Sequence, residues 1–147
     1  MFDSLKILNV SGFDTSLVTD MGETFASLGS LTSLDISNFN TENVETMEYM
    51  FDYCYSLTYL NIGKLKTDKV KNMAYMFRSL EFIREIDVSG FKTDLVTDMS
   101  YMFNDMALTS LDVSNFNTSN VRNMQYMFGN CGELTSLDLS NFDTKLV

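Results

Sequence analysis

Apolar and polar residues recur along this chain in a pattern about 26 residues long. A clear copy runs from Leu108 to Cys131, with the sequence LTSLDVSNFNTSNVRNMQYMFGNC. The Thr of the motif F-x-T-x-x-V marks the period in steps of 26, 26, 26, 25 and 26 residues, at Thr15, Thr41, Thr67, Thr93, Thr118 and Thr144. A period of this length indicates repeated supersecondary units that bury their apolar faces against one another.

Each repeat has two halves with different apolar spacing. In the second repeat, Leu34 and Ile36 alternate with polar residues, which predicts a short half-buried strand. The second half spaces its apolar residues at i, i+3, i+6, i+7 and i+10, on one face of a short helix or a run of tight turns, at Val44, Met47, Met50, Phe51 and Cys54. Thr41 precedes this segment and is a candidate N-cap of the helix.

These halves predict an α/β solenoid with one short parallel strand and one short helix per coil. Consecutive parallel strands need a crossover of about this length, and such crossovers are right-handed. We expect a single repeat domain over residues 1–147, with units that start near residues 5, 31, 57, 83 and 108 and a half unit from 134. Because neither end carries a polar capping unit, we expect a fragment of a longer protein.

Composition excludes several classes of function. The net charge of -10 argues against nucleic-acid binding, which needs a basic surface. The basic cluster Lys64, Lys66, Lys69 and Lys71 is interpreted as a solvated face that balances neighbouring acids. No apolar run is long enough to insert into a membrane, and the first residues, Met1 to Ser4, do not resemble a signal peptide.

Positions that recur once per repeat form columns, and several columns predict the core. Cys54 and Cys131 share a column with Leu28, Leu80 and Met106, and three coils separate them, so we expect core thiols without a disulfide. The other core columns are Met47, Met73, Met99 and Met124; Phe51, Phe77, Phe103 and Phe128; and Phe13, Phe39, Phe91, Phe116 and Phe142. We expect the Thr column to cap helices and to bond neighbouring coils.

Polar columns beside the strands are the first candidate binding surface. The candidate residues are Asp35, Ser37, Asp87, Ser89, Asp112, Ser114, Asp138 and Ser140. Carboxylates stacked one strand apart repel one another, so serine hydroxyls, water or cations must compensate. Calcium takes oxygen ligands of this kind, but a solvated, hydrogen-bonded face is the simpler interpretation. We expect no metal site, also because the chain has no His.

A tyrosine column is the second candidate surface. It consists of Tyr49, Tyr75, Tyr101 and Tyr126, and Glu23 takes its place in the first repeat. The rings either cover the seams between coils or form an exposed row suited to sugar or protein contacts.

The motif LTSLDxSxFxTxxVxxMxYMFxxC resembles the BspA-type leucine-rich-repeat surface proteins of bacteria. The similarity extends from Leu5 to Val147. It implies a leucine-rich-repeat-like curved solenoid on a secreted or cell-surface protein, used for adhesion or partner recognition. Ordinary leucine-rich repeats carry an Asn where this chain has Phe39 and Phe116. The resemblance implies no catalytic residues and no cofactor.

Together these observations favour a non-enzymatic extracellular scaffold for protein interaction or adhesion. Its partner would be a protein or glycan that contacts the Asp/Ser face or the tyrosine row. The alternative is a structural segment that stacks end to end through its open ends. An enzyme is disfavoured because no nucleophile–base pair or phosphate-binding loop is present.

Overall fold

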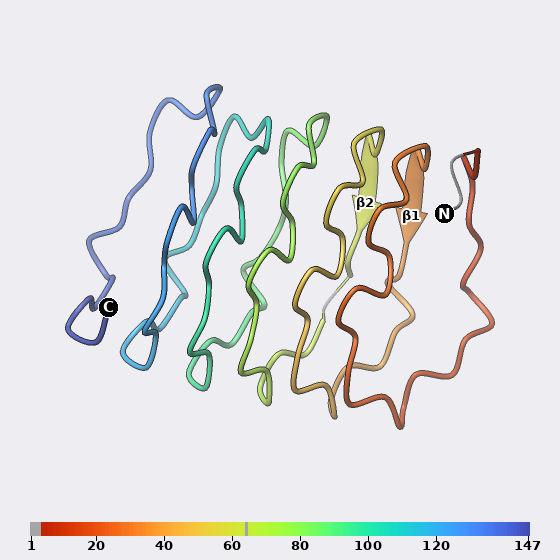
Figure 1. Cartoon of the computed structure of the whole chain (residues 1–147). Helices are drawn as coiled ribbons and strands as arrows, with labels where there is room; N and C mark the ends of the chain where they lie inside the picture. Colours follow the sequence, from red (N-terminus) through yellow and green to blue (C-terminus); the bar gives the residue numbers. More distant parts are fainter. Residues whose placement is uncertain (1–3, 64) are drawn as a thin grey trace.

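The computed structural model describes residues 4–63 and 65–147 of the chain. This part contains no helix, and its only strands are β1 (Ser33–Asp35) and β2 (Tyr59–Asn61). The two strands pair in parallel, with Ser33 opposite Tyr59 and Asp35 opposite Asn61 (Figure 1). Each pair of partners is therefore one repeat apart in the sequence.

The predicted α/β leucine-rich-repeat-like right-handed solenoid, with one strand and one helix per coil, is wrong. Among the described residues, the first half of the repeat forms a β-strand in only two repeats. One isolated parallel bridge, between Ile7 and Ser33, extends the pairing of β1 to the first repeat. The second half forms tight turns where helices were expected. The physical reason lies in where the backbone N–H groups of this second half donate.

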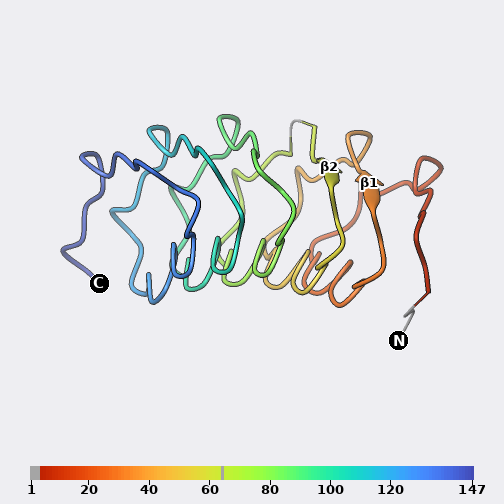
Figure 2. The ribbon, with the colours of Figure 1, turned by 90° about the horizontal axis from the view of Figure 1, so that it is seen from above.

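Neighbouring repeats nevertheless lie side by side from one end of the chain to the other (Figures 1 and 2). A second line of isolated parallel bridges crosses five repeats at Asp20, Thr46, Asn72, Asp98 and Asn123. The chain therefore returns to an equivalent place once in every repeat.

Backbone N–H groups in the second half alternate between two kinds of acceptor. The Tyr49 N–H donates to the Ala74 carbonyl of the next repeat at 3.0 Å, whereas the Met50 N–H donates to the Met47 carbonyl at 3.2 Å. The same alternation continues through Phe51 and Asp52. In an α-helix every interior N–H bonds four residues back, so a segment that gives every second N–H to its neighbour cannot be helical.

The alternation requires a left-handed residue twice in each repeat. In the second repeat these are Tyr49 and Tyr53, with φ of 56° and 59°. Every other non-glycine residue with positive φ in the described chain occupies an equivalent position, namely Glu23, Ser27, Tyr75, Ser79, Tyr101, Asp105, Tyr126 and Asn130. Each costs roughly 1–2 kcal/mol. The four backbone bonds that this segment gives to the next repeat, each worth about 0.5–1.5 kcal/mol, offset that cost.

The predicted core is largely confirmed. Side chains at the helical spacing, Val44, Met47, Met50, Phe51 and Cys54, are all 0% exposed. A continuous stack of rings runs through the centre with centroid separations of 5.7, 5.6, 5.7 and 5.8 Å, formed by Phe25, Phe51, Phe77, Phe103 and Phe128.

The second phenylalanine column is only partly core. Phe91 and Phe116 are buried, as predicted, and their rings lean against Phe77 and Phe103. Phe13 was expected in the same column but is 61% exposed. It lies in the first repeat, where no described repeat packs on its outer side.

Buried threonines join the repeats through a hydroxyl ladder. The Thr41 Oγ1 donates to the Lys66 carbonyl and accepts from the Lys66 N–H, both at 2.8 Å. Equivalent double bonds join Thr15 to Asn40, Thr67 to Lys92, Thr93 to Asn117 and Thr118 to Asp143. The expected bond between coils is thus confirmed. The expected helix cap is wrong, because the hydroxyl serves the next repeat.

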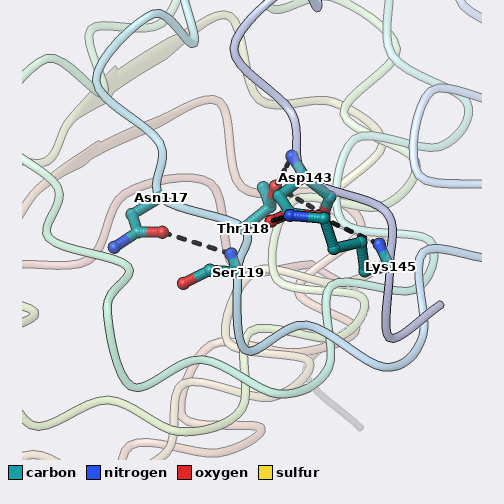
Figure 3. A network of polar contacts seen from close by, with 5 residues as sticks. All are labelled: Asn117, Thr118, Ser119, Asp143 and Lys145. Carbon is teal, nitrogen blue, oxygen red and sulfur yellow. Dashed lines mark hydrogen bonds and ion pairs between the residues drawn. The ribbon is translucent and has the colours of Figure 1, made fainter.

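Figure 3 shows the last bonds of this ladder together with the turns beside it. Ser119 N–H donates to Asn117 Oδ1 at 3.1 Å, and Lys145 N–H donates to Asp143 Oδ1 at 3.0 Å. Each side chain closes a turn on the backbone two residues ahead. The residue that pairs with the threonine therefore also shapes the corner that follows it.

The ladder predicts a large cost for removing one hydroxyl. We expect Thr67→Val to lower the free energy of unfolding by about 2–4 kcal/mol, since the Lys92 N–H and C=O both lose their partner. This corresponds to a fall in Tm of roughly 5–10 °C, measured by circular dichroism. Thr67→Ser, which keeps the hydroxyl, is the control and should retain most of the stability. Equal losses in the two variants would show that the methyl group matters rather than the ladder.

Candidate functional site

The Asp/Ser columns form corner turns rather than free side chains. In each corner the aspartate Oδ1 accepts the N–H of the serine two residues ahead at 2.9 Å, in the pairs Asp35–Ser37, Asp87–Ser89, Asp112–Ser114 and Asp138–Ser140. Asn9 and Asn61 make the same turn where the column carries an amide. All eight predicted residues are exposed, so they remain accessible although each has a structural role.

The corner carboxylates are held ionised. Hydrogen bonds from the side chain and then from the N–H of the paired serine lower the pKa of Asp35, Asp87 and Asp112 below its usual value. The pKa of Asp138 is also lowered, chiefly by the N–H of Ser140. For Asp35 the Asn61 amide adds a further bond at 3.1 Å. Hydrogen bonding thus compensates the stacked charges.

Two shallow cavities open between these corners. One has a volume of about 310 Å³ and is lined by Gly63, Leu65, Lys66, Asp87, Ser89, Gly90 and Phe91. The other has a volume of about 450 Å³ and includes Asp112, Ser114, Ser136 and Asp138. The second cavity therefore brings predicted residues of two neighbouring repeats together, Asp112 and Ser114 with Asp138, whereas the first holds predicted residues of one repeat, Asp87 and Ser89.

The tyrosine row is a continuous ring stack. Centroid separations are 4.4 Å from Tyr49 to Tyr75, 4.7 Å from Tyr75 to Tyr101 and 5.3 Å from Tyr101 to Tyr126. Interplanar angles between these neighbours are 11°, 6° and 18°, so the ring faces cover one another. The first three rings are half-buried, and Tyr126 is 61% exposed. The row thus covers the seams between repeats and also presents ring edges to solvent.

Arg78 lies over the first two rings of this row, Tyr49 and Tyr75, and the repeat pattern in the sequence did not reveal it. Its guanidinium binds Asp52 in a bidentate pair at 2.7 and 2.8 Å. It also lies 4.2 Å from the Tyr53 ring centroid and 4.6 Å from that of Tyr75. The pair is largely buried, with side-chain exposures of 18% for Arg78 and 7% for Asp52. The 26-residue spacing of these opposite charges was the signal that could have revealed it.

An acidic hollow adjoins the first tyrosine. Its volume is about 180 Å³, and Asp20, Glu23, Glu48 and Tyr49 contribute to its lining. Burial, followed by the nearby Asp98 and Glu23, raises the pKa of Glu48. The surface beside the row is therefore strongly negative.

Within the described residues, the cysteines and carboxylates form neither a reactive thiol site nor a group that could hold a metal ion. Cys54 and Cys131 are both free, and each Sγ donates to the carbonyl of an earlier repeat at 3.1 Å. Burial raises the pKa of Cys54 to about 11, which keeps its thiol protonated. Among residues 4–63 and 65–147, no three His, Cys, Asp or Glu side chains are grouped to hold a metal ion.

The structure describes three of the four lysines of the predicted basic face. Lys71 pairs with Glu45 at 2.6 Å and Lys69 donates to Asn43 at 2.8 Å, while Lys66 is exposed. These contacts agree with a solvated face that balances acids. Lys64 of this face, and Met1 to Asp3 of the predicted start, lie outside the described residues.

The lowered pKa values predict how one corner responds to pH. An ionised Asp112 contributes stability that is present above its unfolded pKa of about 3.9 and is lost as pH falls through its lower folded pKa. We expect Asp112→Asn, which can keep the turn as Asn61 does, to lower Tm slightly at pH 7 and not at all near pH 2. Asp112→Ala should lower Tm at both values, since it removes the turn. A difference between wild type and Asp112→Asn that grows in acid would contradict this assignment.

The buried ion pair predicts strong coupling between its members. We expect Arg78→Met to lower the free energy of unfolding by about 2–4 kcal/mol, because Asp52 is left buried without its partner. The double variant Asp52→Leu/Arg78→Met should recover most of this loss, since no unpaired charge remains. Chemical denaturation of the four proteins measures the coupling. Additive losses would show that the pair is not coupled.

The part of the chain that the structure describes has no helix of the length and apolar character that crossing a membrane requires.

Comparisons with known proteins place the chain in a family. No curated protein and no solved structure matches the sequence. A family model described as "Mycoplasma protein of unknown function, DUF285" matches residues 1–86 and again residues 81–147. The two matches together span the chain, and the chain therefore belongs to this family of repeat proteins.

Proposed function

We propose that this protein is a non-enzymatic scaffold that binds another protein through its tyrosine row. The observation that carries the proposal is the continuous stack from Tyr49 to Tyr126, with rings 4.4 to 5.3 Å apart. Arg78 lies over Tyr49 and Tyr75, and backbone bonds between repeats fix the spacing of the rings. Rigid aromatic side chains bind with little loss of conformational entropy, which suits a protein interface.

The packing of the rings supports a protein partner over a glycan. Sugars stack on open aromatic faces, but the faces of Tyr75 and Tyr101 are covered by their neighbours. Ring edges and phenolic hydroxyls remain, and these suit hydrogen bonds and apolar contacts with a polypeptide. The acidic hollow beside Tyr49 favours basic residues in that partner.

The chemistry of the corners argues against catalysis. Hydrogen bonds lower the pKa of Asp87 and Asp112, so both stay ionised at neutral pH. A general acid or base works best with a pKa near the working pH. The Cys54 thiol, with its pKa near 11, is a poor nucleophile.

We infer that this protein is secreted or displayed on a bacterial cell surface, as surface proteins of the BspA type are. The inference rests on the resemblance of the M-x-Y-M-F motif, as in Met47 to Phe51, and the family description names Mycoplasma proteins. End-to-end stacking stays a prediction as the alternative function.

Binding measurements on immobilised protein test the proposal. A panel of purified extracellular-matrix proteins is passed over the chain, and a glycan array is probed in parallel. We expect at least one protein to bind, and the double variant Tyr75→Asn/Tyr101→Asn to weaken it roughly 30-fold, as loss of central aromatic contacts does. Asparagine tolerates the left-handed backbone of both positions.

Tyr59→Thr is the matched control, because Tyr59 is 53% exposed but lies on β2, outside the row. It should leave binding unchanged. Binding that survives in the double variant, or binding only to glycans, would rule out the tyrosine row as the protein-binding surface.

A further inference from the structure

The fourth repeat is one residue shorter than the other full repeats, and the difference lies between Phe103 and Leu108. In four other places a tight turn leads from one repeat to the next, closed by N–H to C=O bonds of 2.9 to 3.3 Å from Leu31, Leu57, Ile83 and Leu134. The fourth repeat lacks one residue of this turn, and among the described residues Leu108 makes no equivalent bond. A shortened connection therefore lies between two neighbours of full length.

A cavity of about 550 Å³ lies at this shortened connection. Met106 and Ala107 of the fourth repeat line it, together with Ser79 and Glu81 of the third repeat and Glu133 of the fifth. Met106 and Ser79 are only 2% and 4% exposed, whereas both glutamates are exposed. The cavity thus combines buried lining residues with an acidic rim, and its volume is typical of ligand sites.

The Ser79 hydroxyl is a polar group in this lining without a partner among the described residues. The Ser79 N–H donates to the Asn104 carbonyl at 2.9 Å, but the Oγ makes no hydrogen bond in that part of the chain. Every side-chain N or O atom that is fully enclosed there does have a partner. The Ser79 Oγ is therefore not enclosed, and the cavity is the open space that it reaches. Asp105, at the equivalent position of the next repeat, lines the same cavity.

Carboxylates outnumber cations around the cavity. Glu81, Asp105 and Glu133 line it, and Arg84 lies at its edge. The Arg84 Nη1 is 3.9 Å from the Glu133 Oε2 and donates to the Ala107 carbonyl at 3.4 Å. Both members of this ion pair are more than half exposed, so their mutual attraction is weak. The cavity therefore favours a positively charged ligand.

We propose that this cavity binds the guanidinium group of an arginine side chain in a partner polypeptide. No three carboxylates of the described residues are grouped to hold a metal ion, which favours a cation whose charge is spread over several atoms. A guanidinium is planar and carries several N–H donors, so it can donate to the Ser79 Oγ and to the Asp105 carboxylate together. The methylene groups of the same side chain can pack against Met106 and Ala107.

A polypeptide supplies this group better than free arginine does. The α-carboxylate of the free amino acid would face the acidic rim of Glu81 and Glu133, and a peptide bond carries no such charge. The site shares no residue with the tyrosine row. It rests on the proposed function only in taking the partner to be a polypeptide, and a small arginine probe tests it without the row.

Titration of the ¹⁵N-labelled chain with Nα-acetyl-arginine amide, followed by NMR, tests the proposal. We expect saturable shifts of the Ser79, Met106 and Ala107 amide signals, with a Kd in the millimolar range that suits so small a ligand. Nα-acetyl-citrulline amide has a similar shape without the charge and should cause no such shifts. Free arginine should bind more weakly than the blocked compound. Equal shifts with the citrulline compound, equal affinity for Nα-acetyl-lysine amide, or tighter binding of free arginine would overturn the assignment.

Variants of the lining give a second, independent test. Asp105→Asn removes the charge and Ser79→Gly removes the hydroxyl, and both new residues suit the left-handed backbone there, with φ of 56° and 61°. We expect each to raise the Kd of the blocked arginine roughly 5-fold. Gly132→Phe should abolish binding, because a Cβ at Gly132 meets nothing within 4 Å and the ring can occupy the cavity.

Glu85→Gln is the matched control, because it removes an exposed carboxylate of the fourth repeat that does not line the cavity. It should leave the Kd unchanged. If Glu85→Gln weakens binding as much as Asp105→Asn does, or if Ser79→Gly and Asp105→Asn both bind as the wild type does, the general negative charge of the chain attracts the arginine and the cavity is not its site.

Discussion

The structure depends on hydrogen bonds that cross from one repeat to the next. With no helix in the described residues, the chain cannot satisfy its buried N–H and C=O groups within a segment. Every second N–H around Met47 to Tyr53 is therefore given to the following repeat, and the Thr41 hydroxyl both donates to it and accepts from it. A repeat without neighbours would lose these bonds together with its apolar cover, so stability is a property of the stack.

The same bonds fix the spacing of everything attached to the backbone. Parallel strands lie about 4.8 Å apart, and the tyrosine and phenylalanine rings follow at centroid separations between 4.4 and 5.8 Å. Stacked aromatic faces are thus a consequence of the backbone ladder. The phenylalanine stack is enclosed except at Phe128, which is half-buried, and the tyrosine stack is left at the surface, where its edges form a pre-organised contact surface.

Two of the positions at which the repeats differ carry specific features. Arg78 stands where other repeats have Ala26 or Gly129, and there it forms a buried ion pair beside the tyrosines. Gly90 stands where Asn115 and Asn141 donate to carbonyls of the preceding repeat, and there a cavity opens. Because equivalent positions recur once in every repeat, each departure can be compared with the residues at the same position in the neighbouring repeats.

The sequence by itself determined the period, the core columns and the absence of a disulfide between Cys54 and Cys131, because periodic apolar positions and fixed spacing suffice for these. It also identified the corner aspartates and the tyrosine row as polar or aromatic columns. It could not distinguish a helix from tight turns over Val44 to Cys54, since both bury the same residues. Only the tertiary structure decided this, because the choice depends on whether the Tyr49 N–H bonds within its own repeat or to Ala74 of the next.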